Sequence, residues 1–227
     1  MSTAEPHAAV EPLASGQRMT RVEFHELYKS TPRGKFELIG GVVFMASPLG
    51  WKHGFFHANA IAWLAGYRFA TPGIEILDNA SAALDDQSEV QPDISLRIKS
   101  EFGGQTHRFG SFLGGVPELV IEIADSSKRT DLGPKLIDYE RAGALEYVVF
   151  ALEPDEIHWH LRRDGRLIRV SPDGDGLYRS AAFPGLWLDP VAFFADDGPA
   201  LAASLNRGLA TPDHAAFVER MSAAQAR

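Results

Sequence analysis

One apolar segment constrains the fold of this chain more than any other. Leu119 to Ala124 is a nearly continuous apolar run, rich in β-branched residues, that follows Pro117. Such a run is typical of a strand that is buried on both faces of a sheet. Glu122 interrupts the run, and an ionised carboxylate is costly to bury unless a cation or several hydrogen-bond donors meet it. The sequence therefore predicts a central strand with a buried acid that needs a partner.

The segment after this strand supplies a candidate partner. A helix is expected to begin at Thr130 or Asp131, either of which can cap it, and to end at Gly143. Lys135 lies near the start of this helix, thirteen residues after Glu122. From the spacing alone, a structural ion pair and a catalytic lysine remain equal alternatives.

The rest of the chain alternates helical and strand patterns around this unit. The capping box at Thr20 and Glu23 predicts a first helix, and Gly40-Gly41 predicts a hairpin turn. Further helices are expected at 53–69, 191–194 and, after the N-cap Thr211, in the last part of the chain, and a polar, glycine-rich loop at 99–116. The remaining strands are expected at 74–77, 90–98, 145–152, 156–161, 166–170 and 177–182. This order predicts one α/β domain with a mixed central sheet at 19–197, preceded by a disordered tail at 1–18 and followed by a helical extension at 198–227.

Composition narrows the classes of protein. The chain has 227 residues, no cysteine, 45% hydrophobic residues and a net charge of −8. The lack of cysteine excludes disulfides and thiolate metal sites and fits a reducing compartment. Neither a signal peptide nor an apolar run of the ~20 residues needed to span a bilayer is found, so a cytoplasmic protein is expected. The negative charge argues against a general nucleic-acid binder but not against a nuclease, whose metal ligands are themselves acidic.

A second carboxylate strengthens the case for a metal site. Asp93 follows Pro92 at the start of a predicted strand, so Asp93 and Glu122 are expected on neighbouring strands. Mg²⁺ prefers oxygen ligands and commonly uses one or two carboxylates, with water and substrate phosphate completing its shell. A lysine beside such a pair can orient water or stabilise charge that develops on phosphorus.

These residues stand in a recognisable order. Pro92-Asp93, then Glu118-Leu-Val-Ile-Glu-Ile-Ala-Asp-Ser-Ser127, then Asp131-Leu-Gly-Pro-Lys-Leu-Ile-Asp-Tyr139 resemble the PD-(D/E)XK nuclease pattern. Together with Phe36-Glu-Leu-Ile-Gly-Gly41 and Phe183-Pro-Gly-Leu186, they resemble more closely the Uma family of bacterial restriction-type endonucleases. The resemblance covers roughly residues 19–195. It implies a restriction-endonuclease-like fold, in which helices flank a mixed central sheet, here with extra C-terminal β-hairpins and a helical tail.

The resemblance also implies roles for individual residues. Asp93 and Glu122 resemble the two metal carboxylates, and the backbone carbonyl of Ile123 would complete a site for Mg²⁺ or Mn²⁺. Lys135 resembles a catalytic lysine that has migrated to the following helix, because Ala124 stands where the literal motif has lysine. Glu37 resembles an early glutamate that joins the site through a metal-bound water. The implied substrate is DNA, expected as a duplex, and cutting both strands calls for two sites or two events, which leaves a homodimer open.

The sequence also contains weaker candidates for functional residues and allows an alternative function. His53 and His57 have the spacing of a helical zinc motif but lack its glutamate, so surface or packing roles are favoured, with His53 near the nuclease cleft as the lesser alternative. His158 and His160 are expected as a solvent-facing pair, and Tyr139 as a core residue. The rival function is a catalytically silent nuclease fold that binds nucleic acid or a protein partner.

Overall fold

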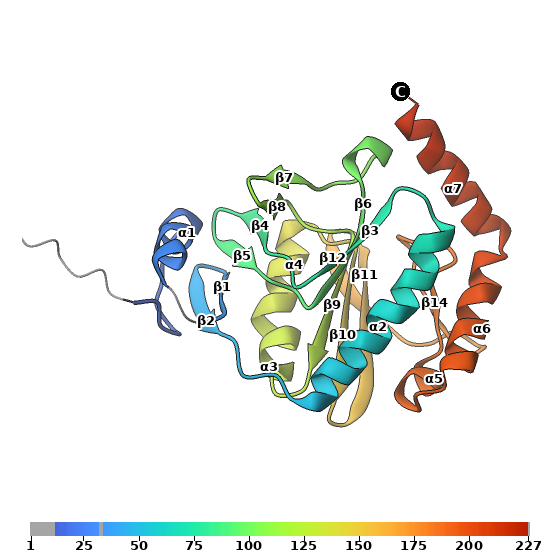
Figure 1. Cartoon of the computed structure of the whole chain (residues 1–227), viewed down its shortest axis with the longest axis horizontal. Helices are drawn as coiled ribbons and strands as arrows, with labels where there is room; N and C mark the ends of the chain where they lie inside the picture. The colour runs from blue at the N-terminus through green and yellow to red at the C-terminus, as the bar shows by residue number, and fades with distance from the viewer. Residues whose placement is uncertain (1–11, 32–33, 227) are drawn as a thin grey trace, which may run out of the picture.

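The computed structural model describes residues 12–31 and 34–226, in which two mixed sheets are flanked by helices (Figure 1). The sheet that contains the predicted central strand has the order β12-β11-β10-β9-β6-β3. Strands β9 and β10 are parallel, and every other neighbouring pair in this sheet is antiparallel. Its strands are β3 (Ile74–Asp78), β6 (Ile94–Ile98), β9 (Leu119–Ala124), β10 (Glu146–Leu152), β11 (Asp155–Arg163) and β12 (Arg166–Val170).

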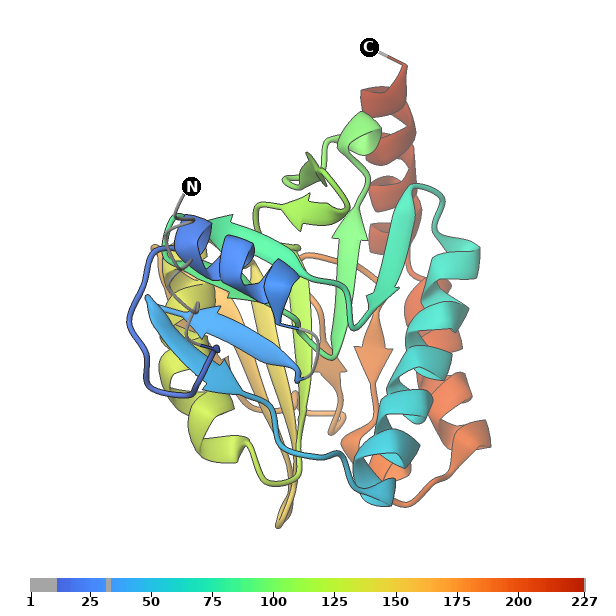
Figure 2. The same cartoon turned by 60° about the vertical axis from the view of Figure 1, so that its left-hand side comes forward.

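The second sheet has the order β2-β1-β5-β4-β8-β7. Its strands are β1 (Phe36–Ile39), β2 (Val42–Met45), β4 (Ala82–Asp85), β5 (Ser88–Val90), β7 (His107–Phe109) and β8 (Phe112–Gly114). Helix α1 (Arg21–Ser30) contacts β1 and β5 in this sheet, whereas α2 (Trp51–Ala70) lies on the other side of the molecule (Figure 2). The predicted α/β fold is therefore confirmed, with two six-stranded sheets rather than one central sheet, besides a separate two-stranded sheet.

Strand β9 separates two cores because its side chains alternate between the two faces of its sheet. Leu119, Ile121 and Ile123 join the larger core, which α2 covers. Val120 and Ala124 face the other core, which β10, the second sheet and α4 (Leu136–Ala142) complete. Glu122 shares the face of Val120 and Ala124, so its carboxylate lies between the two sheets rather than under α2.

The helix expected at 130–143 is interrupted. It consists of α3 (Lys128–Thr130), the segment η2 (Asp131–Lys135) and α4, and Gly133 within it has non-helical dihedrals of φ −115° and ψ −106°. Pro134 follows and has no N–H to donate to the helical ladder. The kink at Gly133 therefore separates the turn that carries Asp131 from the one that carries Lys135, while both side chains stay buried.

The structure differs from the sequence-based prediction in two other segments, residues 99–116 and residues 12–18. The loop expected at 99–116 contains η1 (Ser100–Phe102), β7 and β8, and β8 pairs in parallel with β4. These strands of three residues are too short for an apolar periodicity to reveal them. In the expected tail, residues 1–11 lie outside the described residues, and residues 12–18 lie against β2: the Gly16 N–H donates to the Val43 carbonyl, and Leu13 is buried.

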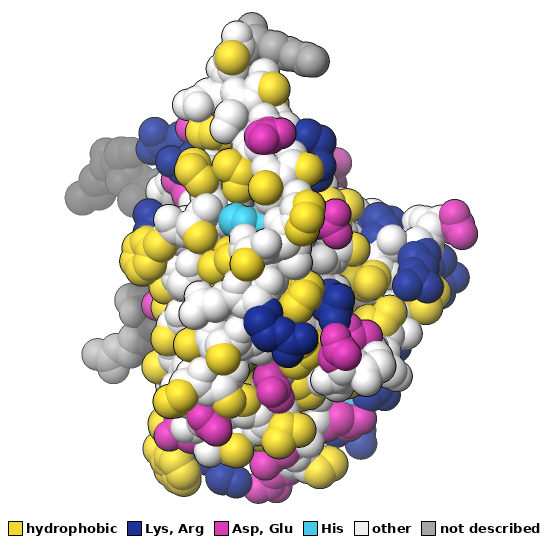
Figure 3. Space-filling view, turned by 90° about the vertical axis from the view of Figure 1, so that its right-hand side faces the viewer, with side chains coloured by type: hydrophobic (Ala, Val, Ile, Leu, Met, Phe, Trp, Pro, Cys, Tyr) yellow, Lys and Arg dark blue, Asp and Glu magenta, His cyan; other side chains and the backbone are white. Residues whose placement is uncertain are grey.

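The C-terminal part of the chain packs on the larger core. It contains the strand pair β13 (Tyr178–Arg179) and β14 (Trp187–Leu188), followed by α5 (Pro190–Phe194), α6 (Gly198–Leu209) and α7 (Pro212–Gln225). Leu205, Phe217 and Met221 belong to that core. Hydrophobic, acidic and basic side chains are interspersed over the outer face of these helices (Figure 3). Within the described part of the chain, no helix has the length and apolar character needed to cross a membrane.

Candidate active site

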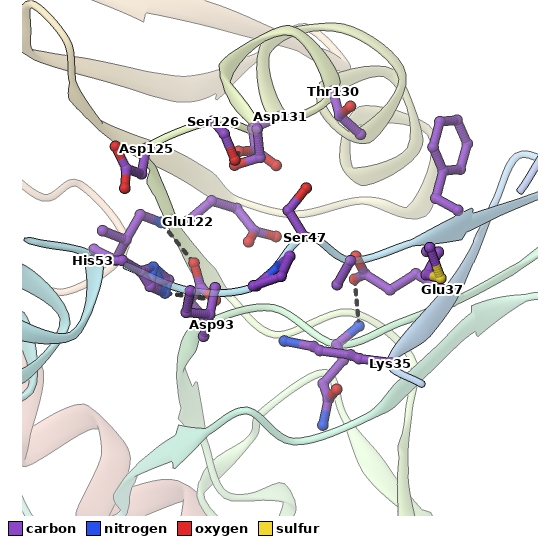
Figure 4. Close-up of a pocket in the computed structure, with 18 of the residues that line it drawn as sticks. Lys35, Glu37, Ser47, His53, Asp93, Glu122, Asp125, Ser126, Thr130 and Asp131 are labelled. Carbon is purple, nitrogen blue, oxygen red and sulfur yellow. Dashed lines mark hydrogen bonds and ion pairs between the residues drawn. The ribbon is translucent and has the colours of Figure 1, made fainter. Parts of the chain in front are cut away.

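The four side chains predicted to form the site line one pocket between the two sheets. Figure 4 labels three of these residues, Glu37, Asp93 and Glu122. Glu37 comes from β1, Asp93 directly precedes β6, Glu122 lies in β9 and Lys135 ends η2. All four residues are buried, with at most 7% of their surface exposed. Four segments that are distant in the sequence therefore bring their charged groups to one place.

Lys135 lies at the centre of the charged groups. Its Nζ is 3.1 Å from Oε1 of Glu122, 3.0 Å from Oε2 of Glu37 and 3.7 Å from Oδ1 of Asp131. The predicted partner of the buried Glu122 is thus confirmed as an ion-pair partner, and Lys135 reaches the carboxylates from the helix although Ala124 occupies the motif position on the strand.

Backbone groups fix the position of Asp93. Its Oδ2 accepts a hydrogen bond of 2.8 Å from the Ile123 N–H, and its own carbonyl accepts one from Asn79 N–H. The antiparallel pairing of Ile94 with Ile121 brings the start of β6 beside the end of β9. Asp93, one residue before β6, is therefore held beside the neighbouring strand β9 that carries Glu122, whereas the sequence predicts Asp93 within the strand itself.

Glu37 and Glu122 are each oriented by a second group. Oε1 of Glu37 accepts a hydrogen bond of 2.7 Å from the Gln91 N–H, which leaves Oε2 for Lys135. The hydroxyl of Tyr139 donates to Oε1 of Glu122 over 3.3 Å. Tyr139 is fully buried and belongs to the core, as expected, but its hydroxyl also joins the charged cluster.

The cluster holds three carboxyl groups around a single ammonium. Burial alone would lower the pKa of Lys135, but the surrounding carboxylates, first Glu122 and then Glu37, raise this pKa well above its ordinary value. Burial raises the pKa of Glu122 well above its ordinary range against the opposing effect of Lys135, and the neighbouring carboxylates add to the rise. The pKa of Asp131 is raised for the same reasons. Lys135 therefore stays an ammonium, while the raised pKa values of Glu122 and Asp131 mean that these two carboxylates bind protons more tightly.

The donor set fits a hard divalent cation in part. In residues 12–31 and 34–226, no three His, Asp or Glu side chains form a complete metal cage. Mg²⁺ does not require one, because one or two carboxylates suffice when water and substrate phosphate supply the other oxygens. Asp93 and Glu122 supply two carboxyl groups to the same pocket, and the carboxyl groups around Lys135 outnumber its single ammonium.

Two further residues belong to the site although the sequence-based assignment left them out. Asp131 was considered only as a helix cap, yet its Oδ2 accepts from the Ser127 hydroxyl over 2.5 Å and its Oδ1 faces Lys135. Its position four residues before Lys135 is the sequence signal for this contact. His53, weighed as a lesser alternative, lies in the pocket with Nε2 3.6 Å from Oδ1 of Asp93. Burial lowers the pKa of His53 against the opposing charge of Asp93.

The prediction of a solvent-facing histidine pair on β11 was wrong. His158 and His160 are both buried, with 8% and 6% of their surface exposed. Strand β11 lies inside its sheet between β10 and β12, so both of its edges are paired. Nδ1 of His160 lies 3.2 Å from the Tyr147 carbonyl, and Nε2 of His158 lies 3.0 Å from Glu156.

Comparison with known proteins gives a family and a fold. A crystal structure described as "a putative nuclease belonging to DUF820" from Anabaena variabilis ATCC 29413 superposes with a TM-score of 0.56 at 14% sequence identity. The match covers 81% of this chain and 97% of that one, which shows that the two share a fold. No protein with curated annotation matches the chain. The sequence model of the family Uma2, described as "Putative restriction endonuclease", matches residues 21–191, so the chain belongs to the Uma2 family.

Proposed function

We propose that this protein is a metal-dependent endonuclease that hydrolyses phosphodiester bonds in DNA. The observation that carries the proposal is the convergence of Glu122, Glu37 and Asp131 on the buried Lys135 ammonium, with Asp93 in the same pocket, in a chain that belongs to a nuclease-like family. A structural ion pair needs one carboxylate for one lysine. The surplus of acids is better explained by a cation that joins them.

We assign the cation to Asp93, Glu122 and the backbone carbonyl of Ile123, and we expect Mg²⁺ or Mn²⁺ because the donors are all oxygens. A divalent cation supplies Lewis-acid polarisation of the scissile phosphate and makes water a stronger acid. The Ile123 N–H, which donates to Asp93, holds one carboxylate oxygen in place and leaves Oδ1 for binding.

Lys135 acts as a fixed positive charge in this proposal. Because its pKa is raised, it carries its proton at neutral pH and cannot accept another. Its role is therefore to orient water through N–H donors and to offset the charge that develops on the phosphate. Glu37 and Asp131 are positioning residues, since they contact the ammonium and fix its location between the two sheets.

The rival function, a silent module that binds nucleic acid or a protein partner, makes a different prediction for metal binding. We expect a titration with Mn²⁺, followed by calorimetry, to show saturable binding that Asp93→Asn abolishes. Asp125→Asn is the matched control, because Asp125 also lines the pocket but, within residues 12–31 and 34–226, forms no ion pair with Lys135. Binding by the wild type that both variants retain, or no binding at all, would favour the rival.

A further inference from the structure

Three large apolar side chains border the pocket and are exposed to solvent. Met45, Leu49 and Trp51 have 60%, 62% and 78% of their surface exposed, and we call these three residues the lip. Met45 and Leu49 line the pocket itself, and Trp51 follows Gly50, which also lines it. The lip therefore lies at one edge of the pocket that holds the carboxylates.

The lip differs from the other exposed apolar residues of the described chain. Single exposed apolar side chains are normal on protein surfaces and need no explanation. Val22, Ile137 and Val191 are of this kind, since they lie on three separate helices. The three residues of the lip instead fall within seven positions of the sequence at one edge of one pocket.

Positive groups flank the lip. Lys35 lines the pocket, and its Nζ donates to the Asn79 side chain, with no ion pair to any described residue. Lys52 follows Trp51, is 44% exposed and lies 3.7 Å from Glu153. Trp51 opens the 20-residue helix α2, whose N-cap Gly50 has no side chain to satisfy the first N–H groups. The positive end of this helix dipole and Lys35 both attract phosphate at this pocket, while Glu153 offsets part of the charge of Lys52 and the Asp125 carboxylate lies close to Gly50.

We propose that the lip binds nucleobases that are unstacked beside the scissile phosphate, with Trp51 as the stacking residue. This inference rests on the proposed nuclease function and names its substrate class. A side chain can stack on a base only if that base has left its neighbours, and in an intact duplex this costs a few kcal/mol per step. The cost is absent in a single strand. The substrate of this pocket is therefore single-stranded DNA, or DNA with unpaired bases at the cut, in preference to intact duplex.

Binding of labelled DNA tests this inference without requiring cleavage. Fluorescence anisotropy would compare a short single strand with the duplex of the same sequence, with Ca²⁺ in place of Mg²⁺. We expect the wild type to bind the single strand more tightly, Trp51→Ala to weaken that binding about tenfold, and Trp51→Phe to retain most of it. Phe69→Ala is the matched control, because Phe69 is equally exposed at 78% and lies on the same helix, ~27 Å from Trp51.

Two results would overturn the inference. One is equal affinity for duplex and single strand together with no loss in Trp51→Ala. The other is a dimer in analytical ultracentrifugation that Trp51→Ala converts to a monomer while DNA binding stays unchanged, because the lip would then be occupied by a second copy of the chain.

Failure of the inference can be told apart from failure of the proposed function. If the wild type nicks DNA in Mg²⁺ and Trp51→Ala nicks DNA and binds single strands equally well, the lip has no role in binding, but the proposed nuclease function is supported. If the protein binds single strands selectively through Trp51 but shows no metal-dependent nicking, the role of the lip is supported and the proposed nuclease function is contradicted.

Discussion

At the scale of single residues, the site depends on one ammonium surrounded by acids. The sequence predicts the Glu122–Lys135 pair because an acid in an apolar strand demands a partner. It does not predict Asp131 in the same cluster, because the sequence is equally compatible with Asp131 as a helix cap. Only the structure, with its kink at Gly133, shows that Asp131 faces Lys135. His53 could not be assigned either, because helical spacing fixes the face of a histidine but not the pocket beneath it.

Removing the ammonium should destabilise the protein in a pH-dependent manner. Glu122 and Asp131 have raised pKa values in the fold, so the folded state binds more protons than the unfolded chain above the ordinary carboxyl range. Stability from these groups is present at low pH and is lost as pH rises. Lys135 offsets the loss, and it stays charged because its own pKa is raised. In Lys135→Met the free energy of unfolding should fall by about 3 kcal/mol near neutral pH.

Urea denaturation at about pH 5 and about pH 8 measures this effect, and the loss in Lys135→Met relative to wild type should be larger at the higher pH. Lys29→Met, which breaks an exposed pair with Glu26, is the control and should change little at either pH. An equal loss at both values would contradict the proposed charge balance.

Tyr139 offers a substitution that keeps the core and removes one contact of the cluster. Tyr139→Phe retains the buried ring but loses the hydroxyl that donates to Glu122. We expect a decrease in the free energy of unfolding of about 1 kcal/mol, the usual net value of such a hydrogen bond. Thermal denaturation would measure it, with Tyr28→Phe as a more exposed control; a loss of folding in Tyr139→Phe would show that the hydroxyl has a larger structural role.

At the scale of elements, α4 and the β1–β2 hairpin are joined through Asp138. Oδ2 of Asp138 accepts from the Gly40 N–H over 2.7 Å and from the Ser88 hydroxyl over 2.5 Å, and Arg141 pairs with Oδ1. Gly40 and Gly41 have φ values of +56° and +76°, which the tight turn requires and which L side chains rarely adopt. The hairpin was predicted from this Gly-Gly pair. Its docking on α4 was not, because no local pattern marks a contact between residues 98 positions apart.

Breaking this joint should affect stability and metal binding together. Asp138→Ala removes the acceptor of the buried Ser88 hydroxyl and one of the two acceptors of the Gly40 N–H, which keeps the Ser88 oxygen at 3.0 Å, so we expect a loss of about 2 kcal/mol in the free energy of unfolding. Since α4 follows Lys135 and β1 carries Glu37, the affinity for Mn²⁺ should fall as well. Calorimetry on Asp138→Ala measures the Mn²⁺ affinity and denaturation measures the free energy of unfolding, with Glu26→Ala as a surface control. An unchanged Mn²⁺ affinity in a destabilised protein would show that the contacts of Asp138 do not affect the metal site.

At the scale of the whole molecule, the segment after residue 197 is part of the larger core. The sequence predicts its helices through Thr211 and Pro212, and the hydroxyl of Thr211 accepts from His214 N–H as a cap should. The sequence predicts them as an extension. Their contribution to the core could not be predicted. The spacing of Phe217 and Met221 indicates an apolar helix face, but it does not indicate which part of the protein that face packs against.

Truncating a buried side chain of α7 should therefore destabilise the entire domain. Phe217 is 6% exposed and packs edge-on against Phe183. Phe217→Ala should lower the free energy of unfolding by about 3–5 kcal/mol in a single cooperative transition. Denaturation followed by circular dichroism measures this, with Val218→Ala as a neighbouring, less buried control. A separate early transition for α6 and α7 would show that they fold as an independent unit.

The central claim is that Asp93, Glu122 and Lys135 cut DNA together with a divalent cation. The most direct measurement is the nicking of supercoiled plasmid and of circular single-stranded DNA by purified protein in Mg²⁺ and in EDTA, for wild type, Asp93→Asn, Lys135→Met and the control Asp125→Asn. We expect nicking that requires Mg²⁺, is lost in Asp93→Asn and Lys135→Met, and persists in Asp125→Asn. Nicking that continues unchanged in folded Asp93→Asn, or that survives EDTA, would contradict it.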